Sequence, residues 1–269
     1  MDFFTIAVQD ISSGRKKKLE VLPVFKTAKS EDLMVRGGSF YAVWDEKAGM
    51  WSTNIFTARE IVDSALAKKA EELKDQYPDY EIHTRTLLNY NHKSWTEFQN
   101  YLRSMPDNFV FLDKKLSFAN VQLGNKKDYI SKKLPYVLED GDISAWKELT
   151  DVLYAPKELE KIEWIIGSVV AGDSKDIQKF LVLYGEGGTG KGAIINIIEG
   201  MFPGYTAPFN ARALGSSSNQ FATEAFKNNP LIAIQHDGDL SRIEDNTELN
   251  SIISHEEMLF NEKSQLSSE

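Results

Sequence analysis

The chain has 269 residues, of which 42% are hydrophobic, so it can form one large domain or two ordinary domains with packed cores. It contains no cysteine, which excludes disulfide bonds and cysteine-ligated zinc, and it has neither a long apolar run nor a signal-like start. We therefore expect no membrane partner and a cytoplasmic location. A net charge of −9 excludes a uniformly basic nucleic-acid coat, so any contact with nucleic acid must be local.

Residues 1–155 predict a smaller, mixed α/β leader domain. An alternating strand is expected at residues 19–25, and the aromatic segment 39–52 predicts a hairpin. Capping-box spacing predicts two helices, over residues 57–74 and 94–104. Short apolar runs between turns predict further strands at residues 109–112, 121–125 and 129–130.

Residues 156–269 predict a second α/β domain, with a parallel sheet and helices, and the glycine-rich loop described below makes it a P-loop NTPase candidate. A helix is expected from Pro156, in its first turn, to about Val170. The apolar run Phe180–Tyr184 predicts a strand, and the isoleucine-rich segment after Gly192 predicts a helix. A strand, a glycine-rich loop and a helix in this order are the setting of a phosphate-binding loop.

The glycine-rich loop reads GEGGTGKG and is the candidate cofactor site. Its glycines allow backbone N–H groups to turn inward around an anion, and the start of the following helix adds partial positive charge. Lys191 is expected to reach the β- and γ-phosphates of ATP, which makes it a candidate catalytic residue. The predicted cofactor-binding residues are Gly185, Glu186, Gly187, Gly188, Thr189, Gly190, Lys191, Gly192 and Ala193.

Magnesium must be held in an unusual way, because Gly192 stands where the loop pattern normally has a Ser or Thr hydroxyl. The run Leu231–Gln235 predicts a buried strand that ends in acidic residues. Phosphate-loop ATPases use carboxylates in such a place to hold Mg²⁺ and to polarise the attacking water. Asp237 is therefore the predicted metal ligand, and Asp237 and Asp239 are the predicted catalytic carboxylates.

These motifs resemble the helicase part of phage and plasmid primase-helicases, the group that includes the poxvirus primase-helicase. Such proteins are superfamily 3 helicases with an AAA+ core, and the resemblance extends over about residues 105–263. It implies ATP and Mg²⁺ as cofactors, single-stranded DNA as a partner, a homo-oligomeric hexameric ring, and contacts with other replication proteins. The segment Ser254–Lys263 resembles the family motif whose lysine touches DNA phosphates in the pore, so Lys263 is the DNA-binding candidate.

The resemblance implies a DNA helicase, an ATPase that translocates on one strand during phage or plasmid DNA replication. The family's polar sensor and arginine finger cannot be identified before Glu269, so the ATPase domain is expected to be C-terminally incomplete. Loss of the arginine would slow hydrolysis. An ATP-binding assembly or loader protein with little hydrolysis of its own is the alternative. A small-molecule kinase would need an arginine-rich lid, but only Arg212 and Arg242 follow Gly200.

Overall fold

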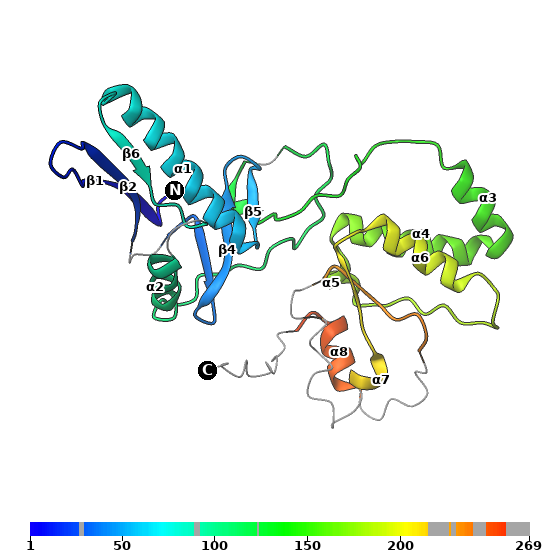
Figure 1. The fold of residues 1–269 in the computed structure, drawn as a ribbon. Coiled ribbons are helices and arrows are strands. Elements are labelled where there is room, and N and C mark those ends of the chain that lie inside the picture. The colour runs from blue at the N-terminus through cyan, green and yellow to red at the C-terminus, as the bar shows by residue number, and fades with distance from the viewer. Residues whose placement is uncertain are drawn as a thin grey trace. The chain divides into compact units, whose positions relative to one another are not determined.

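The computed structural model shows a mixed α/β protein with small sheets and several helices (Figure 1). It forms two compact units: unit 1 comprises Met1–Leu112 and Gln122–Ser131, and unit 2 comprises Asp113–Val121 and the described chain from Lys132 onward. The two units therefore divide the chain before the predicted domain boundary at residue 155. That boundary stays a prediction, because compact units need not be separately folding domains. The structure describes residues 1–26, 30–88, 92–122, 124–214, 226, 230–238 and 246–256.

Unit 1 contains two three-stranded sheets. The strands are β1 (Phe4–Asp10), β2 (Lys18–Phe25), β3 (Leu33–Arg36), β4 (Ser39–Asp45), β5 (Met50–Ser52) and β6 (Glu81–Thr84). In the first sheet β2 pairs antiparallel with β1 and parallel with β6, and in the second sheet β3, β4 and β5 form an antiparallel meander. Trp44 of β4 lies opposite Trp51 of β5, which confirms the predicted aromatic hairpin.

Two helices pack on the strands of unit 1 and confirm the two helices predicted there. They are α1 (Ile55–Gln76) and α2 (His92–Leu102). The start predicted for α1 is wrong: Asn54 Oδ1 accepts a hydrogen bond from the Phe56 N–H at 2.9 Å, so Asn54 caps the helix. The buried residues of α1 recur every three or four positions and face the core, and they are Ala58, Val62, Leu66, Ala70 and Leu73.

The strands predicted between residues 109 and 130 are wrong, because the described residues of this segment lie in no strand. Leu112 is instead buried beside Trp44 and Trp51. A short 3-10 helix, η1 (Lys126–Asp128), follows, and the Lys126 carbonyl accepts a hydrogen bond from Trp51 Nε1 at 2.9 Å. The Trp51 N–H also donates a hydrogen bond to the Ile130 carbonyl at 2.8 Å, so isolated hydrogen bonds hold the segment against the sheet without a strand ladder.

Unit 2 carries six of the described helices and one parallel strand pair. The elements are α3 (Ser144–Leu153), α4 (Pro156–Ala171), α5 (Ser174–Ile177), α6 (Lys191–Met201), β7 (Thr206–Pro208), α7 (Ala211–Leu214), β8 (Ile232–Ile234) and α8 (Thr247–Ile253). Pro156 opens α4, as predicted, and Gly172 closes it with a φ of +79°, close to the predicted end at about Val170. Among the described helices of the whole chain, none has the length and apolarity needed to cross a membrane.

The core of unit 2 lies around the C-terminal half of α6. Four side chains are buried there, Phe118, Leu134, Phe202 and Tyr205, and α4, α6 and β8 add half-buried apolar residues. The Tyr205 hydroxyl accepts a hydrogen bond from the Ser117 N–H at 3.3 Å and donates one to the Lys132 carbonyl at 3.0 Å. This single hydroxyl therefore joins three segments of unit 2 that are distant in sequence.

The strand predicted at Phe180–Tyr184 is not formed in the described structure. Phe180, Val182 and Tyr184 are 53%, 51% and 99% exposed, and the run is extended chain without a strand partner among the described residues. The β8 strand is present as predicted, but its residues are half-buried rather than buried. An apolar run becomes a buried strand only where other strands pair with it, and the parallel pairing in the described part of unit 2 is limited to β7 and β8.

Candidate functional site

The glycine-rich loop lies between the exposed run Phe180–Tyr184 and the start of α6. Gly188 and Gly190 have φ values of +80° and +82°, in the left-handed region that glycine adopts at little cost. The Thr189 hydroxyl donates a hydrogen bond to the Glu186 carbonyl at 2.9 Å and closes the loop on itself. The glycine spacing of the sequence therefore corresponds to a tight, solvent-exposed turn.

Gly190 also lies against the end of α3. A Cβ atom at this position would be 2.8 Å from both methyl carbons of Leu153, which is closer than van der Waals contact permits. Its backbone angle and its surroundings thus both require glycine. The contact shows that α3, which is outside the predicted motif, helps to hold the loop in place.

The Lys191 side chain folds back across the loop. Its Nζ donates hydrogen bonds to the Gly185 carbonyl at 2.9 Å, to the Glu186 carbonyl at 2.5 Å and to the Thr189 hydroxyl at 3.1 Å. An ammonium group has three donors, so the loop oxygens satisfy all of them. A phosphate that entered the loop would therefore replace these neutral oxygens as the hydrogen-bond acceptor of the Lys191 ammonium group.

The first turn of α6 offers further donors. Its N-cap residue, Gly190, makes no side-chain hydrogen bond to the helix, so the N–H groups of Gly192 and Ala193 lack an intrahelical partner. Free N–H groups at a helix start favour anions. Together with the loop glycines and Lys191, they form a donor set that fits the phosphates of ATP.

The end of β8 is held by Gln235, which the sequence did not single out. Gln235 Oε1 accepts a hydrogen bond from the Ala211 N–H at 2.8 Å, and its Nε2 donates to the Asp237 carbonyl at 2.9 Å. A Cβ atom on Gly238 would lie 3.1 Å from the same Nε2. Gln235 thus fixes the turn that exposes the Asp237 carboxylate to solvent. The sequence offered one signal for Gln235: it is the polar residue at the end of the apolar run that forms β8.

A second contact joins this turn to α6. His236 Nε2 lies 3.3 Å from Glu199 Oε2 in the third turn of α6. Glu199 was not predicted, because its role depends on how β8 approaches the helix. Within the described residues, no three His, Asp or Glu side chains gather closely enough to hold a metal ion. Asp237 stays the predicted protein ligand of Mg²⁺, and the other ligands would have to come from ATP phosphates and water, because residue 192 has no hydroxyl.

The predicted site residues have three different outcomes. The structure brings Lys191 together with Gly185, Glu186 and Thr189. It places Asp237 directly after His236, and no hydrogen bond joins its carboxylate to the loop in the described part of the chain. Asp239 and Lys263 lie outside the described residues, so their catalytic and DNA-binding roles stay predictions.

Comparison with known proteins adds no family to these observations. No protein-family model, curated protein or solved structure matches this chain. The functional assignment therefore depends on the glycine loop, the end of β8 and the chemistry that their side chains permit.

Proposed function

We propose that unit 2 is the ATP-binding module of a superfamily 3-type DNA helicase with an AAA+-like fold. The protein would act in phage or plasmid DNA replication as a homo-oligomeric ring on single-stranded DNA. One observation carries the proposal: the Lys191 ammonium group lies across a glycine loop at the start of α6, and its hydrogen-bond partners among the described residues are all neutral oxygens. A preformed cation among free backbone donors is what a nucleotide triphosphate requires.

The residues of the loop have separate roles in this proposal. Backbone N–H groups from Gly187 to Ala193 surround the β-phosphate, and Lys191 moves from the loop carbonyls to the β- and γ-phosphate oxygens. Asp237, and Asp239 with it, orients and polarises the attacking water. Bound Mg²⁺ would supply charge neutralisation between the β- and γ-phosphates. His236 and Glu199 keep the end of β8 against α6, so that the acids and the loop belong to one unit.

An ATP-gated assembly or loader protein is the second candidate. The exposed apolar side chains of Phe180, Val182 and Tyr184 favour it, because large exposed apolar patches commonly mark surfaces that contact another protein segment. In this case ATP binding would order the loop and its neighbouring surface, and hydrolysis would be slow. Both candidates use the same loop and differ in turnover.

The test is steady-state ATP hydrolysis by the full chain, with and without single-stranded DNA, together with ATP binding. We compare Lys191→Ala with Lys179→Ala, which removes an exposed lysine of unit 2 outside the loop. The helicase proposal expects DNA-stimulated turnover that falls about a hundredfold or more in Lys191→Ala, because one charged donor to the transition state is lost. Lys179→Ala should leave the turnover unchanged.

The other outcomes separate the candidates. ATP binding that Lys191→Ala abolishes, without turnover in the unmodified protein, would support the assembly protein over the helicase. Equal ATP binding by both variants would overturn both candidates, because the loop would then not be the nucleotide site.

A further inference from the structure

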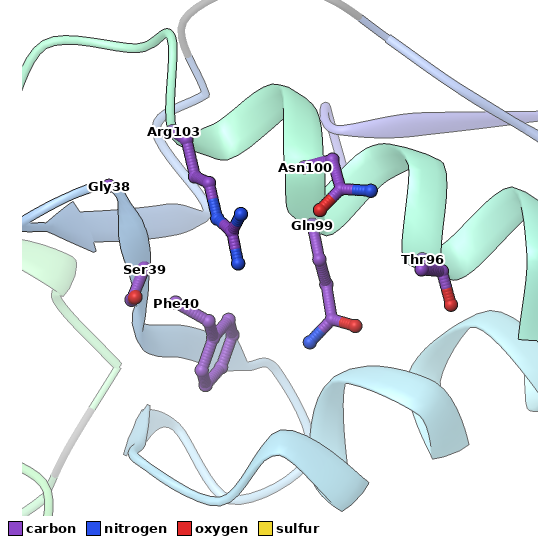
Figure 2. A pocket seen from close by; sticks show the side chains of 7 residues that line it. All are labelled: Gly38, Ser39, Phe40, Thr96, Gln99, Asn100 and Arg103. Atoms are coloured by element: carbon purple, nitrogen blue, oxygen red, sulfur yellow. The ribbon is translucent and has the colours of Figure 1, made fainter. Parts of the chain in front are cut away.

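Unit 1 has a pocket of about 260 Å³ between α2 and the turn that joins β3 to β4 (Figure 2). Helix α2 contributes polar side chains that follow one another at helical spacing, and the turn contributes small residues and one aromatic ring. The residues used below are Gly38, Ser39, Phe40, Thr96, Gln99 and Arg103. The pocket shares no residue with the glycine loop, so it is separate from the proposed ATP site.

The chemistry of the pocket favours an anion. None of its lining residues is acidic, and Arg103 supplies a positive charge. In Figure 2 the side chains of Gln99, on α2, and of Arg103, the residue after the end of α2, point toward the space above the Phe40 ring. Neither side chain makes a hydrogen bond or ion pair with the described part of the chain. A guanidinium group without a carboxylate partner, in a protein with a net charge of −9, is suited to bind phosphate through its planar fork of N–H donors.

The backbone around the pocket is held firmly. Gly38 has a φ of +71°, and a Cβ atom there would lie 3.0 Å from the Arg103 Cα atom, so turn and helix meet backbone to backbone. The neighbouring Gly37 N–H donates a hydrogen bond to Asp107 Oδ1 at 2.8 Å. These contacts fix the distance between the turn and the end of α2, so the pocket exists before any ligand binds.

A second arginine, Arg36, lies on the same hairpin, and aromatic rings of the segment that follows α2 lie beside it. The Arg36 guanidinium carbon lies 4.5 Å from the ring centroid of Phe109 and 5.1 Å from that of Phe111. Arg36 forms no ion pair with the described residues. Proteins commonly bind single-stranded nucleic acids with aromatic rings next to arginines, because the bases stack on the rings and the phosphates bind the cations. Half-buried rings and arginines occur together here.

We propose that this pocket binds one nucleotide of a single-stranded DNA segment. Arg103 and Gln99 hold its phosphate, Ser39 and Thr96 offer hydroxyl groups to its polar edges, and the base lies against Phe40. The volume is slightly below the roughly 300 Å³ at which sites begin to enclose whole drug-sized ligands, so the pocket takes one unit of a strand and the rest stays on the surface. The choice of DNA as the strand rests on the proposed function, whereas the pocket itself is independent of the ATP site and is tested without ATP.

The test is fluorescence anisotropy with a labelled oligothymidine and the full chain, without ATP or Mg²⁺. Arg103→Gln is compared with Lys68→Gln, which removes the same charge from an exposed position on α1 of the same unit. Arg103→Gln should weaken binding about tenfold, which corresponds to one lost charged contact. It should also lower the slope of log affinity against log salt by about 0.7, the value for one phosphate of a single strand. Lys68→Gln should change neither quantity by more than about twofold.

Competition identifies the source of the phosphate. Unlabelled oligothymidine should displace the probe at concentrations where thymidine monophosphate and inorganic phosphate do not. Displacement by the monophosphate at equal nucleotide concentration would overturn the proposal in favour of a free nucleotide, and equal losses in Arg103→Gln and Lys68→Gln would overturn the site. Arg103 is exposed, so circular dichroism should show both variants folded. The difference in oligothymidine affinity between the two variants should persist when Lys191→Ala is added to each. A failure of the ATPase proposal would therefore leave this result unchanged.

Discussion

His236 and Glu199 link the two segments that carry the candidate phosphate and metal chemistry: His236 Nε2 lies 3.3 Å from Glu199 Oε2. Glu199 is on α6, which starts at Lys191, and His236 directly precedes Asp237. A helix rises about 1.5 Å per residue, so this contact lies about 12 Å along α6 from the loop. The pair therefore sets the direction in which β8 ends relative to α6 and leaves the Asp237 carboxylate exposed to solvent.

The first prediction concerns this pair. Both side chains are partly exposed, so His236→Gln should lower the free energy of unfolding by at most about 1 kcal/mol. Under the ATPase proposal it should lower kcat several-fold and leave the KM for ATP nearly unchanged, because the loop donors remain in place. Steady-state kinetics and urea unfolding measure both effects. His83→Gln, which removes a His–Glu contact in unit 1, is the control, and an equal fall in kcat there would contradict a positioning role for His236.

The second prediction separates two glycines of the same segment. Gly190→Ala should destabilise the protein by about 1–3 kcal/mol, because its φ of +82° is strained for alanine and its Cβ would meet Leu153. Gly192→Ala should be neutral or stabilise by up to about 1 kcal/mol, since the site is open and lies in a helix. Urea unfolding of both variants measures the difference. Leu153→Ala should relieve only the steric part of the Gly190→Ala effect, and equal stabilities of the two glycine variants would contradict the described loop.

The third prediction restores the missing hydroxyl. The space around Gly192 is free within 4 Å of a Cβ atom, so Gly192→Ser can be accommodated without repacking. If ATP and Mg²⁺ bind at the loop, the serine hydroxyl should lower the Mg²⁺ concentration needed for half-maximal hydrolysis. A magnesium titration of ATPase activity measures the change, with Gly192→Ala as the control without a hydroxyl. An unchanged magnesium requirement in Gly192→Ser would indicate that the metal lies elsewhere.

Local signals in the sequence predicted the helices and the hairpin well. Pro156 and Gly172 mark the ends of α4, and Trp44 and Trp51 lie opposite each other in the β4–β5 pair, so residues close in sequence determine these elements. The strand expected at Phe180–Tyr184 depends on partners that are distant in the chain. Apolar composition alone cannot provide those partners, and in the described structure this run is exposed.

The candidate site divides in the same way. The glycine loop and Lys191 could be predicted, because the glycines that allow the loop's backbone angles and the lysine that supplies its charge are adjacent in the sequence. Gln235, Glu199 and Arg103 could not, since each acts through a neighbour from another element. The spacing of the polar residues on α2 was the signal for the pocket, but it has meaning only after Gly38 is known to touch Arg103.

The fourth prediction tests which residue caps α1. The capping-box pattern pointed to Thr57 with Glu60, whereas the structure has Asn54 as the cap. Asn54→Ala should therefore lower the free energy of unfolding by about 1 kcal/mol, because the Phe56 N–H loses its acceptor. Glu60→Ala, which removes the acceptor that a capping box would need, should change it by less than about 0.5 kcal/mol, since Glu60 is exposed. Thermal or urea unfolding compares the two variants, and a larger loss in Glu60→Ala would favour the capping box.

The fifth prediction concerns Tyr205, the hydroxyl at the centre of unit 2. Burial raises the pKa of Tyr205 to about 12, above the value of about 10 for an unfolded tyrosine. A raised pKa favours the neutral phenol in the folded state. The stability that this group contributes is therefore fully present below pH 10 and is lost as the pH rises from about 10 to about 12.

Tyr205→Phe should lower the free energy of unfolding at pH 7 by about 1–3 kcal/mol, because the Ser117 N–H and the Lys132 carbonyl lose their hydrogen-bond partner in a buried place. The same variant should lose less stability than the unmodified protein between pH 9 and pH 11, since its residue 205 cannot ionise. Urea unfolding at these pH values measures both effects, with Tyr184→Phe as the control because Tyr184 is 99% exposed. If Tyr205→Phe lost as much stability on alkalinisation as the unmodified protein, the phenol would not be titrating from a buried, hydrogen-bonded position, and its role as the link between the three segments of unit 2 would have to be abandoned.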